Sequence, residues 1–310
     1  MNFKPPNASE RLEAIGPTEG LAKNLQKALE PGTDFEPVSV PKPGDWLAEH
    51  SERGQSFDEF IISKARRPNK IRRKIYLQPL GQFPDGQLPL VGRSEQYARA
   101  YFTMEVQVLP PFSINASNVT KRINQYTRRQ QVLTGDVLAI LRKSLPSDAF
   151  CVLALTMEDL YPEPSWNYVF GQASLRGRVG VYSFARYDPG FYGEKRGKDY
   201  DKILLRRSCR VLSHETAHMF GLQHCIYFKC VLNGSNHLKE SDSRPLHLCP
   251  VCLRKLQHGI GFDVVNRYRH LLHFYREAGC DSESQWIVSR LKWILGVDEA
   301  QAIIEHEASH

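Results

Sequence analysis

The stretch from residue 214 to residue 252 constrains this chain more than any other, because two metal-ligand patterns follow one another there. The first is His214-Glu215-Thr216-Ala217-His218, in which two histidines are four positions apart. Residues at that spacing share one face of a helix, so both imidazoles can bind one metal ion. The surrounding pattern is helical, and we expect a helix from about residue 202 to residue 220.

The residues that follow indicate a third ligand. Gly221 stands where the helix must stop and turn sharply, and glycine tolerates the left-handed conformation that such a turn needs. The turn can return His224 to the metal as a third nitrogen ligand. Three neutral ligands with one open position are typical of catalytic zinc, and Glu215 beside them is placed to take a proton from a water on the metal. The alternative is a surface histidine pair with an unrelated third histidine, which leaves the register of these residues unexplained.

Cysteine spacing indicates a second metal site. Four of the seven cysteines fall within 28 positions, as the pairs Cys225 and Cys230, then Cys249 and Cys252. With no signal peptide at the N-terminus, two such pairs favour zinc over a disulfide framework. Four thiolates complete the coordination of zinc, so we expect a structural ion that organises residues 225–253. The alternative is a thioredoxin-like redox motif at residues 249–252, which needs a strand before it and a helix start at it.

The remaining pattern predicts a mixed α/β fold. We expect an N-terminal extension over residues 1–70, partly ordered, and one catalytic domain over residues 71–310 that ends in C-terminal helices. A helix capped by Ser94 and another opening at Thr134 alternate with apolar runs of strand length. The expected strands cover residues 75–80, 105–109, 149–155 and 179–184, and the expected C-terminal helices cover residues 262–277 and 282–295.

Charge and hydropathy limit the classes of partner that this chain is expected to bind. The net charge is +7 and the pI is about 9.0, and the densest basic stretch is Lys64–Lys74, which has no interleaved aromatic residue. This favours a solvated linker over a nucleic-acid surface, so we expect no nucleic-acid partner. No run approaches the ~18 apolar residues of a membrane span, and we expect a cytoplasmic or nuclear protein without a membrane partner.

The combined pattern, H-E-x-x-H-x-x-G-x-x-H-C followed by C-x-x-C, resembles that of the archaemetzincins. Residues 165–174, 183–187 and 234–238 look like the second vertebrate type of that family, and the resemblance covers about residues 70 to 275. The positions that carry the motif are His214, Glu215, His218, Gly221, His224, Cys225, Cys230, Cys249 and Cys252.

The resemblance implies a zinc metallopeptidase of the metzincin clan, with an α/β fold, a mixed sheet and an active-site helix. It implies a catalytic zinc ion on His214, His218 and His224, a second zinc ion on the four cysteines, and Glu215 as general base. It further suggests peptide or protein substrates, with short peptides cleaved in an aminopeptidase-like manner.

One position departs from the family pattern. Cys230-Val231-Leu232 replaces the usual C-x-M, whose Met forms an apolar floor beneath the histidines. Leu232 is apolar and of similar size, and Asn233-Gly234 still favours a turn, so we expect the floor to be kept.

Two further expectations concern function. The strand near residues 181–184 is predicted to be a sheet edge that can pair with an extended peptide. The alternative to an enzyme is a non-catalytic zinc-stabilised interaction module, for example one that binds nucleic acid, and nothing in such a module requires a Glu beside three histidines.

Overall fold

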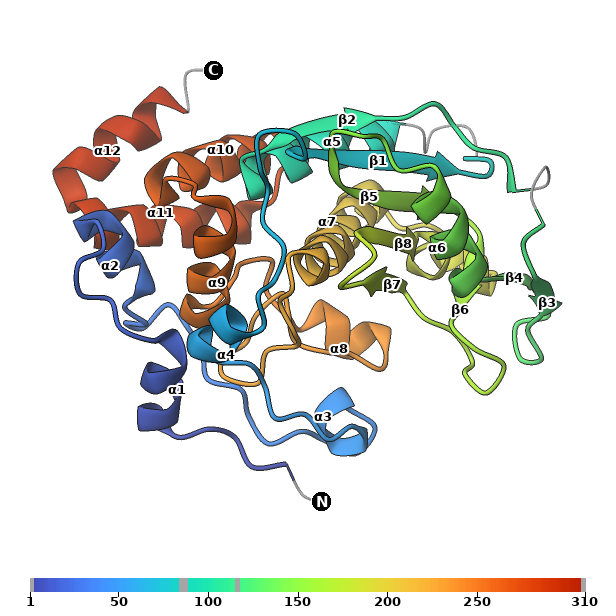
Figure 1. Ribbon diagram of the computed structural model, residues 1–310, viewed down its shortest axis with the longest axis horizontal. Coiled ribbons are helices and arrows are strands. Elements are labelled where there is room, and N and C mark those ends of the chain that lie inside the picture. The colour runs from blue at the N-terminus through green and yellow to red at the C-terminus, as the bar shows by residue number, and fades with distance from the viewer. Residues whose placement is uncertain (1–2, 84–88, 115–117, 308–310) are drawn as a thin grey trace. The chain divides into compact units, whose positions relative to one another are not determined.

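The structure of the protein is a computed structural model that describes residues 3–83, 89–114 and 118–307 (Figure 1). The chain forms two compact units. The sheet unit comprises Arg67–Arg99 and Thr103–Phe220, and the helical unit comprises Met1–Arg66, Ala100–Phe102 and Gly221–His310. The sequence suggested an N-terminal extension over residues 1–70 and a catalytic domain over residues 71–310. The two compact units are grouped differently, because the N-terminal segment packs on the C-terminal helices.

The sheet unit is built on a five-stranded mixed sheet, which confirms the expected mixed α/β fold. Its strand order is β2-β1-β5-β8-β7, in which β7 is antiparallel to β8 and the other neighbours are parallel. The strands are β1 (Lys74–Leu80), β2 (Glu105–Val108), β5 (Ala149–Thr156), β7 (Gly171–Ser174) and β8 (Val179–Ser183).

Helices cover both faces of this sheet, which explains why the central strand β5 is buried along its whole length. Val152 and Ala154 of β5 share a core with Val137 on one face. Tyr182 of β8 points to the opposite face, where it lies near Cys209. The helices are α5 (Pro89–Phe102), α6 (Thr134–Lys143), which carries Val137, and α7 (Tyr200–Met219), which carries Cys209.

One local prediction in this unit was wrong, and one small sheet was not predicted. Ser94 does not cap α5, which begins at Pro89; the Ser94 hydroxyl instead donates to the carbonyl oxygen of Leu90 at 2.8 Å within the helix. A second, three-stranded sheet was not predicted, and it consists of β3 (Lys121–Ile123), β4 (Gln130–Leu133) and β6 (Asp159–Tyr161) in the order β3-β4-β6.

The expected edge strand was also assigned wrongly. The strand near residues 181–184 is β8, and it pairs with β5 on one side and with β7 on the other. Among the described residues, the edge next to β8 is β7, a short strand without β-branched residues, which periodicity does not mark as a strand.

The helical unit joins the two ends of the chain. In Figure 1 the N-terminal helices lie beside the C-terminal ones, with α2 against α11 and with α1 and α4 against α9. Arg290 of α11, which is fully buried, binds Asp34 at 2.9 Å and donates to the carbonyl oxygen of Ala28 at 3.1 Å. The N-terminal helices are α1 (Ala8–Ile15), α2 (Lys23–Leu29), α3 (Trp46–Glu49) and α4 (Phe57–Ile62).

The C-terminal helices confirm the two that were expected and add others. They are α8 (Leu238–Asp242), α9 (Pro250–Ile260), α10 (Val264–Glu277), α11 (Asp281–Leu295) and α12 (Val297–His306). None of the helices within the described residues is long and apolar enough to cross a membrane.

Candidate functional site

Helix α7 presents the paired histidines on one face. The Nε2 atoms of His214 and His218 lie 3.0 Å apart, and their rings stand at 86° to each other. Two nitrogens bound to one tetrahedral zinc ion at about 2.0–2.1 Å are about 3.3 Å apart, so the observed separation fits a shared metal ion. The helical spacing in the sequence therefore brings these two nitrogen atoms together on one face of α7.

Glu215 lies beside this pair in an apolar setting. The residue is only 6% exposed, and burial raises the pKa of its carboxyl group to about 8. A carboxyl group with a pKa near neutrality is suited to both accept and release a proton. The backbone of edge strand β7 runs close against it, since a Cβ atom placed on Gly171 would lie 2.7 Å from Glu215 Oε1.

The end of α7 that carries the histidines is held firmly within the sheet unit. The Ser213 hydroxyl lies 3.3 Å from the Tyr97 hydroxyl of α5. Phe220, at the C-terminal cap, stacks on Phe150 of β5 with ring centroids 4.3 Å apart. Gly221 follows with a φ of +87°, which a residue with a side chain rarely adopts, so the chain turns where the sequence predicted.

His224, the predicted third ligand, belongs to the helical unit. Its Nδ1 atom donates to Glu52 Oε1 at 2.6 Å, and the ring of Trp46 meets the His224 ring edge-on at 5.1 Å between centroids. Trp46 Nε1 also donates to Glu52 Oε1, at 2.6 Å. Burial alone raises the pKa of Glu52, but these hydrogen bonds outweigh it and hold the pKa below its ordinary value.

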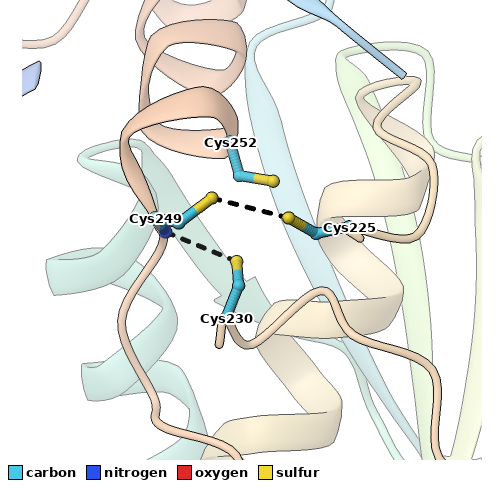
Figure 2. A group of neighbouring side chains, drawn as sticks. All are labelled: Cys225, Cys230, Cys249 and Cys252. Atoms are coloured by element: carbon cyan, nitrogen blue, oxygen red, sulfur yellow. Dashed lines mark hydrogen bonds between the residues drawn. The ribbon is translucent and has the colours of Figure 1, made fainter. Parts of the chain in front are cut away.

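The four predicted cysteines gather in one buried group within the helical unit. Figure 2 shows their sulfur atoms converging, and these atoms all lie within 4.8 Å of one another. Cys225 Sγ and Cys249 Sγ are 3.5 Å apart, close to the roughly 3.8 Å that tetrahedral coordination at a Zn–S distance of ~2.3 Å imposes. The donor set and its spacing therefore fit zinc.

Backbone groups and charge favour thiolates in this group. Cys230 Sγ accepts N–H groups from Leu232 at 3.5 Å and from Cys249 at 3.4 Å. Burial raises the pKa of Cys225, but hydrogen bonds from the neighbouring thiols outweigh it and lower the pKa well below its ordinary value. The pKa values of Cys249 and Cys252 are raised well above theirs, mainly by burial at Cys249 and mainly by the hydrogen bond with the Cys225 sulfur at Cys252, so burial and the neighbouring sulfur oppose ionisation of all four thiols together. A divalent ion would remove that conflict.

The structure meets only one of the two requirements of the thioredoxin-like redox alternative. Helix α9 does begin at the motif, with Cys249 at its N-cap, but the residues just before it form no strand. Both motif sulfurs belong to residues that are fully buried, whereas redox-active cysteines are partly exposed. The arrangement therefore favours a metal site.

The turn after Cys230 is built by one side chain. Asn233 Oδ1 accepts the N–H of Cys230 at 2.8 Å, and Asn233 Nδ2 donates to the carbonyl oxygens of Cys225 and Phe228 at 2.7 and 3.0 Å. Leu232, in place of the family Met, is fully buried. The predicted turn is thus present, with an apolar side chain at the substituted position.

Nearby polar residues serve structural roles. His237 caps α8 by accepting the N–H of Glu240 at 3.1 Å, and the Glu240 carboxylate binds Arg244 at 2.9 Å. The His247 ring stacks on the Trp286 ring with centroids 3.9 Å apart, and burial lowers the pKa of His247 to about 3, with Arg290 adding to the effect.

Sequence reasoning missed three residues around these sites. Gly171 lies in a strand with no periodic signal, although the stretch that resembles known relatives contains it. Trp46 lies in the N-terminal extension, for which the sequence indicated no role at either site, and nothing in the sequence marks Glu52, because its partner His224 is 172 positions away.

Comparison with known proteins gives consistent matches. The model of peptidase family M54 matches residues 101–258. Archaemetzincin-2 from Macaca fascicularis is 39% identical over 293 residues, which cover 86% of this chain and 80% of that protein. Archaemetzincin-2 from Homo sapiens is 38% identical over 291 residues, which cover 85% of this chain and 81% of that protein.

Among solved structures, the archaemetzincin from Methanopyrus kandleri is 28% identical, with a TM-score of 0.47. The match covers 62% of this chain and 97% of that chain.

Proposed function

The chain belongs to peptidase family M54, the archaemetzincins, and is a zinc metallopeptidase; from this premise we propose that His214, His218 and His224 hold its catalytic zinc ion. The observation that carries the proposal is the pair of Nε2 atoms 3.0 Å apart on α7, beside a buried carboxyl group. Gly221, with its φ of +87°, supports His224 as the third ligand, because a sharp turn separates it from α7.

Glu215 is the proposed general base. Zinc, when bound, polarises the scissile carbonyl group and lowers the pKa of water. The Glu215 carboxylate then accepts a proton from the attacking water and passes it to the leaving amine. Its buried position, with a pKa near 8 before any cation is added, supports this exchange, because a nearby cation lowers that pKa and frees the carboxylate.

Strand β7 is the proposed binding edge for the substrate. Within the described residues it pairs with a strand on one side only, and Gly171 at its start runs against Glu215. An extended peptide can pair with the other side of such a strand. The substrates are peptides or proteins, and aminopeptidase-like cleavage of short peptides is our proposal by family resemblance.

A second zinc ion on the four cysteines is proposed as structural. Four buried sulfurs saturate its coordination, so no position remains for a substrate. The family membership of the chain favours hydrolysis over a purely structural interaction module.

The decisive test is Glu215→Gln, which keeps the shape of the side chain and removes its basicity. We expect hydrolysis of peptides to fall by about 10²–10⁴-fold while two zinc ions remain bound. His224→Ala is the comparison variant, and it should retain one zinc ion. Peptides with free and with acetylated amino termini report aminopeptidase character. Near-normal turnover of Glu215→Gln, or the loss of a zinc ion from it, would show that the assigned role is wrong.

A further inference from the structure

The segment from Trp46 to Gln55 contacts the stretch that carries His224 at several points. Gln55 Oε1 accepts the N–H of Gln223 at 3.2 Å, and Gln55 Nε2 donates to the carbonyl oxygen of Gly221 at 3.3 Å. These bonds hold the residues on both sides of the turn that leads to His224.

Gln55 is itself held in place by Lys255. It is 3% exposed, and the fully buried Lys255 donates through Nζ to its backbone oxygen at 2.7 Å and to Oε1 at 3.2 Å. Its neighbour Gly54 has a φ of +73°, and a Cβ atom there would lie 2.6 Å from the side chain of Ile226. The segment therefore packs on the stretch after the turn without room for adjustment.

Trp46 is anchored as firmly at the other end of the segment. Its backbone N–H donates to both carboxylate oxygens of Glu240 at 3.1 Å. Its ring lies directly on Gly234, where a Cβ atom would come within 2.4 Å of Cδ1. From this position Trp46 Nε1 donates to Glu52 Oε1, the same oxygen that accepts from His224 Nδ1.

The hydrogen bond at Nδ1 determines which nitrogen of His224 is available. A carboxylate only accepts, so Nδ1 carries the hydrogen and Nε2 keeps its lone pair. A carboxylate behind a zinc-binding imidazole orients the ring and makes it a stronger ligand. Trp46 fixes the carboxylate in turn.

We propose that Glu52 is the positioning residue for His224, so that a part of the chain far from the histidine motif in sequence prepares the catalytic zinc site. This rests on the proposed function, in which His224 is a ligand. Glu52 does not contact substrate or zinc; it acts through the imidazole.

The test is the zinc affinity of the histidine site, measured by competition with chelators of graded strength. The cysteine site in the same molecule serves as an internal reference. We expect Glu52→Gln, which removes the charge and keeps the shape, to weaken the histidine site by about 10- to 100-fold and leave the cysteine site unchanged. Glu49→Gln is the matched control, because Glu49 is exposed, lies three residues away, and accepts a long hydrogen bond from the Gly44 N–H at 3.3 Å.

A purely structural role for Glu52 would lower the melting temperature of Glu52→Gln and leave zinc affinity at the histidine site at the wild-type value, which overturns the proposal. If Glu52→Gln does not fold, Glu52→Asp decides: it keeps the charge but withdraws the carboxylate by about one carbon–carbon bond, and wild-type affinity would again overturn the proposal. His224→Ala is measured alongside. If that variant still binds two zinc ions, the proposed function fails and the role of Glu52 fails with it, whereas wild-type affinity in the Glu52 variants alone overturns only the role of Glu52.

Discussion

Gly171→Ala tests whether the edge strand and the proposed base form one site. A Cβ atom at this position would lie 2.7 Å from Glu215 Oε1 and 2.9 Å from both Cγ and Cδ. Non-bonded atoms pack at about 3.5 Å or more, so one partner must retreat by roughly 0.8 Å, the difference between 3.5 and 2.7. Gly171 is paired with Tyr182 in the antiparallel register, so the backbone itself accepts alanine.

Either movement disturbs the proposed reaction. If the carboxylate moves, it leaves the position from which it accepts the proton, and kcat falls. If β7 moves instead, the edge that pairs with substrate shifts, and KM rises. A displacement of about 1 Å at a reacting group costs on the order of 10²-fold, so we expect kcat/KM to fall by about 10- to 100-fold, or roughly 1.4–2.7 kcal/mol of transition-state stabilisation.

The assay is steady-state hydrolysis of a fluorogenic peptide, with zinc content and melting temperature measured on the same samples. Overpacking of this kind costs about 1–3 kcal/mol of folding stability, so the variant should fold and retain its zinc. Gly135→Ala is the matched control, because a Cβ atom on Gly135 of α6 meets no atom within 4 Å. The control should keep wild-type kcat/KM. A folded Gly171→Ala enzyme with wild-type kcat/KM would refute the reasoning.

The remaining predictions concern stability. Cys252→Ser removes one of four proposed ligands, so the variant should lose one zinc ion, several kcal/mol of folding stability and, secondarily, activity. The control, Cys280→Ser at the N-cap of α11, should keep both zinc ions. A stable Cys252→Ser protein with two zinc ions contradicts the four-cysteine site. Burial lowers the pKa of His247 to about 3, so between pH ~3 and ~6.5 the unfolded chain binds a proton that the folded chain does not bind. The free energy of unfolding that this difference contributes is complete above pH ~6.5 and is lost as the pH falls toward 3. Because the residue keeps some solvent exposure, we expect about 1 kcal/mol per pH unit, measured by denaturant unfolding as the difference between wild type and His247→Gln; equal slopes for both proteins would contradict it.

The chemistry of both proposed sites could be predicted from the sequence because each depends on short spacings. Four residues along a helix bring His214 and His218 together wherever that helix lies, and Gly221 marks the turn by its own backbone preference. Two cysteine pairs limit the geometry of their site in the same local way. The strands of the main sheet were found for a related reason, since apolar runs such as β5 report burial directly.

Only the tertiary structure decided which strand forms the edge and what lies behind His224. An edge is defined by the missing neighbour, and nothing within residues 171–174 encodes the fact that, among the described residues, β8 pairs with strands on both sides while β7 pairs on one side. Glu52 meets His224 across 172 positions because Trp46 and Gln55 are fixed by contacts with residues still farther along the chain. Helical and strand periods describe a residue's immediate neighbours, whereas such contacts depend on how distant segments pack, so no local pattern could have predicted that the N-terminal segment supports the third histidine.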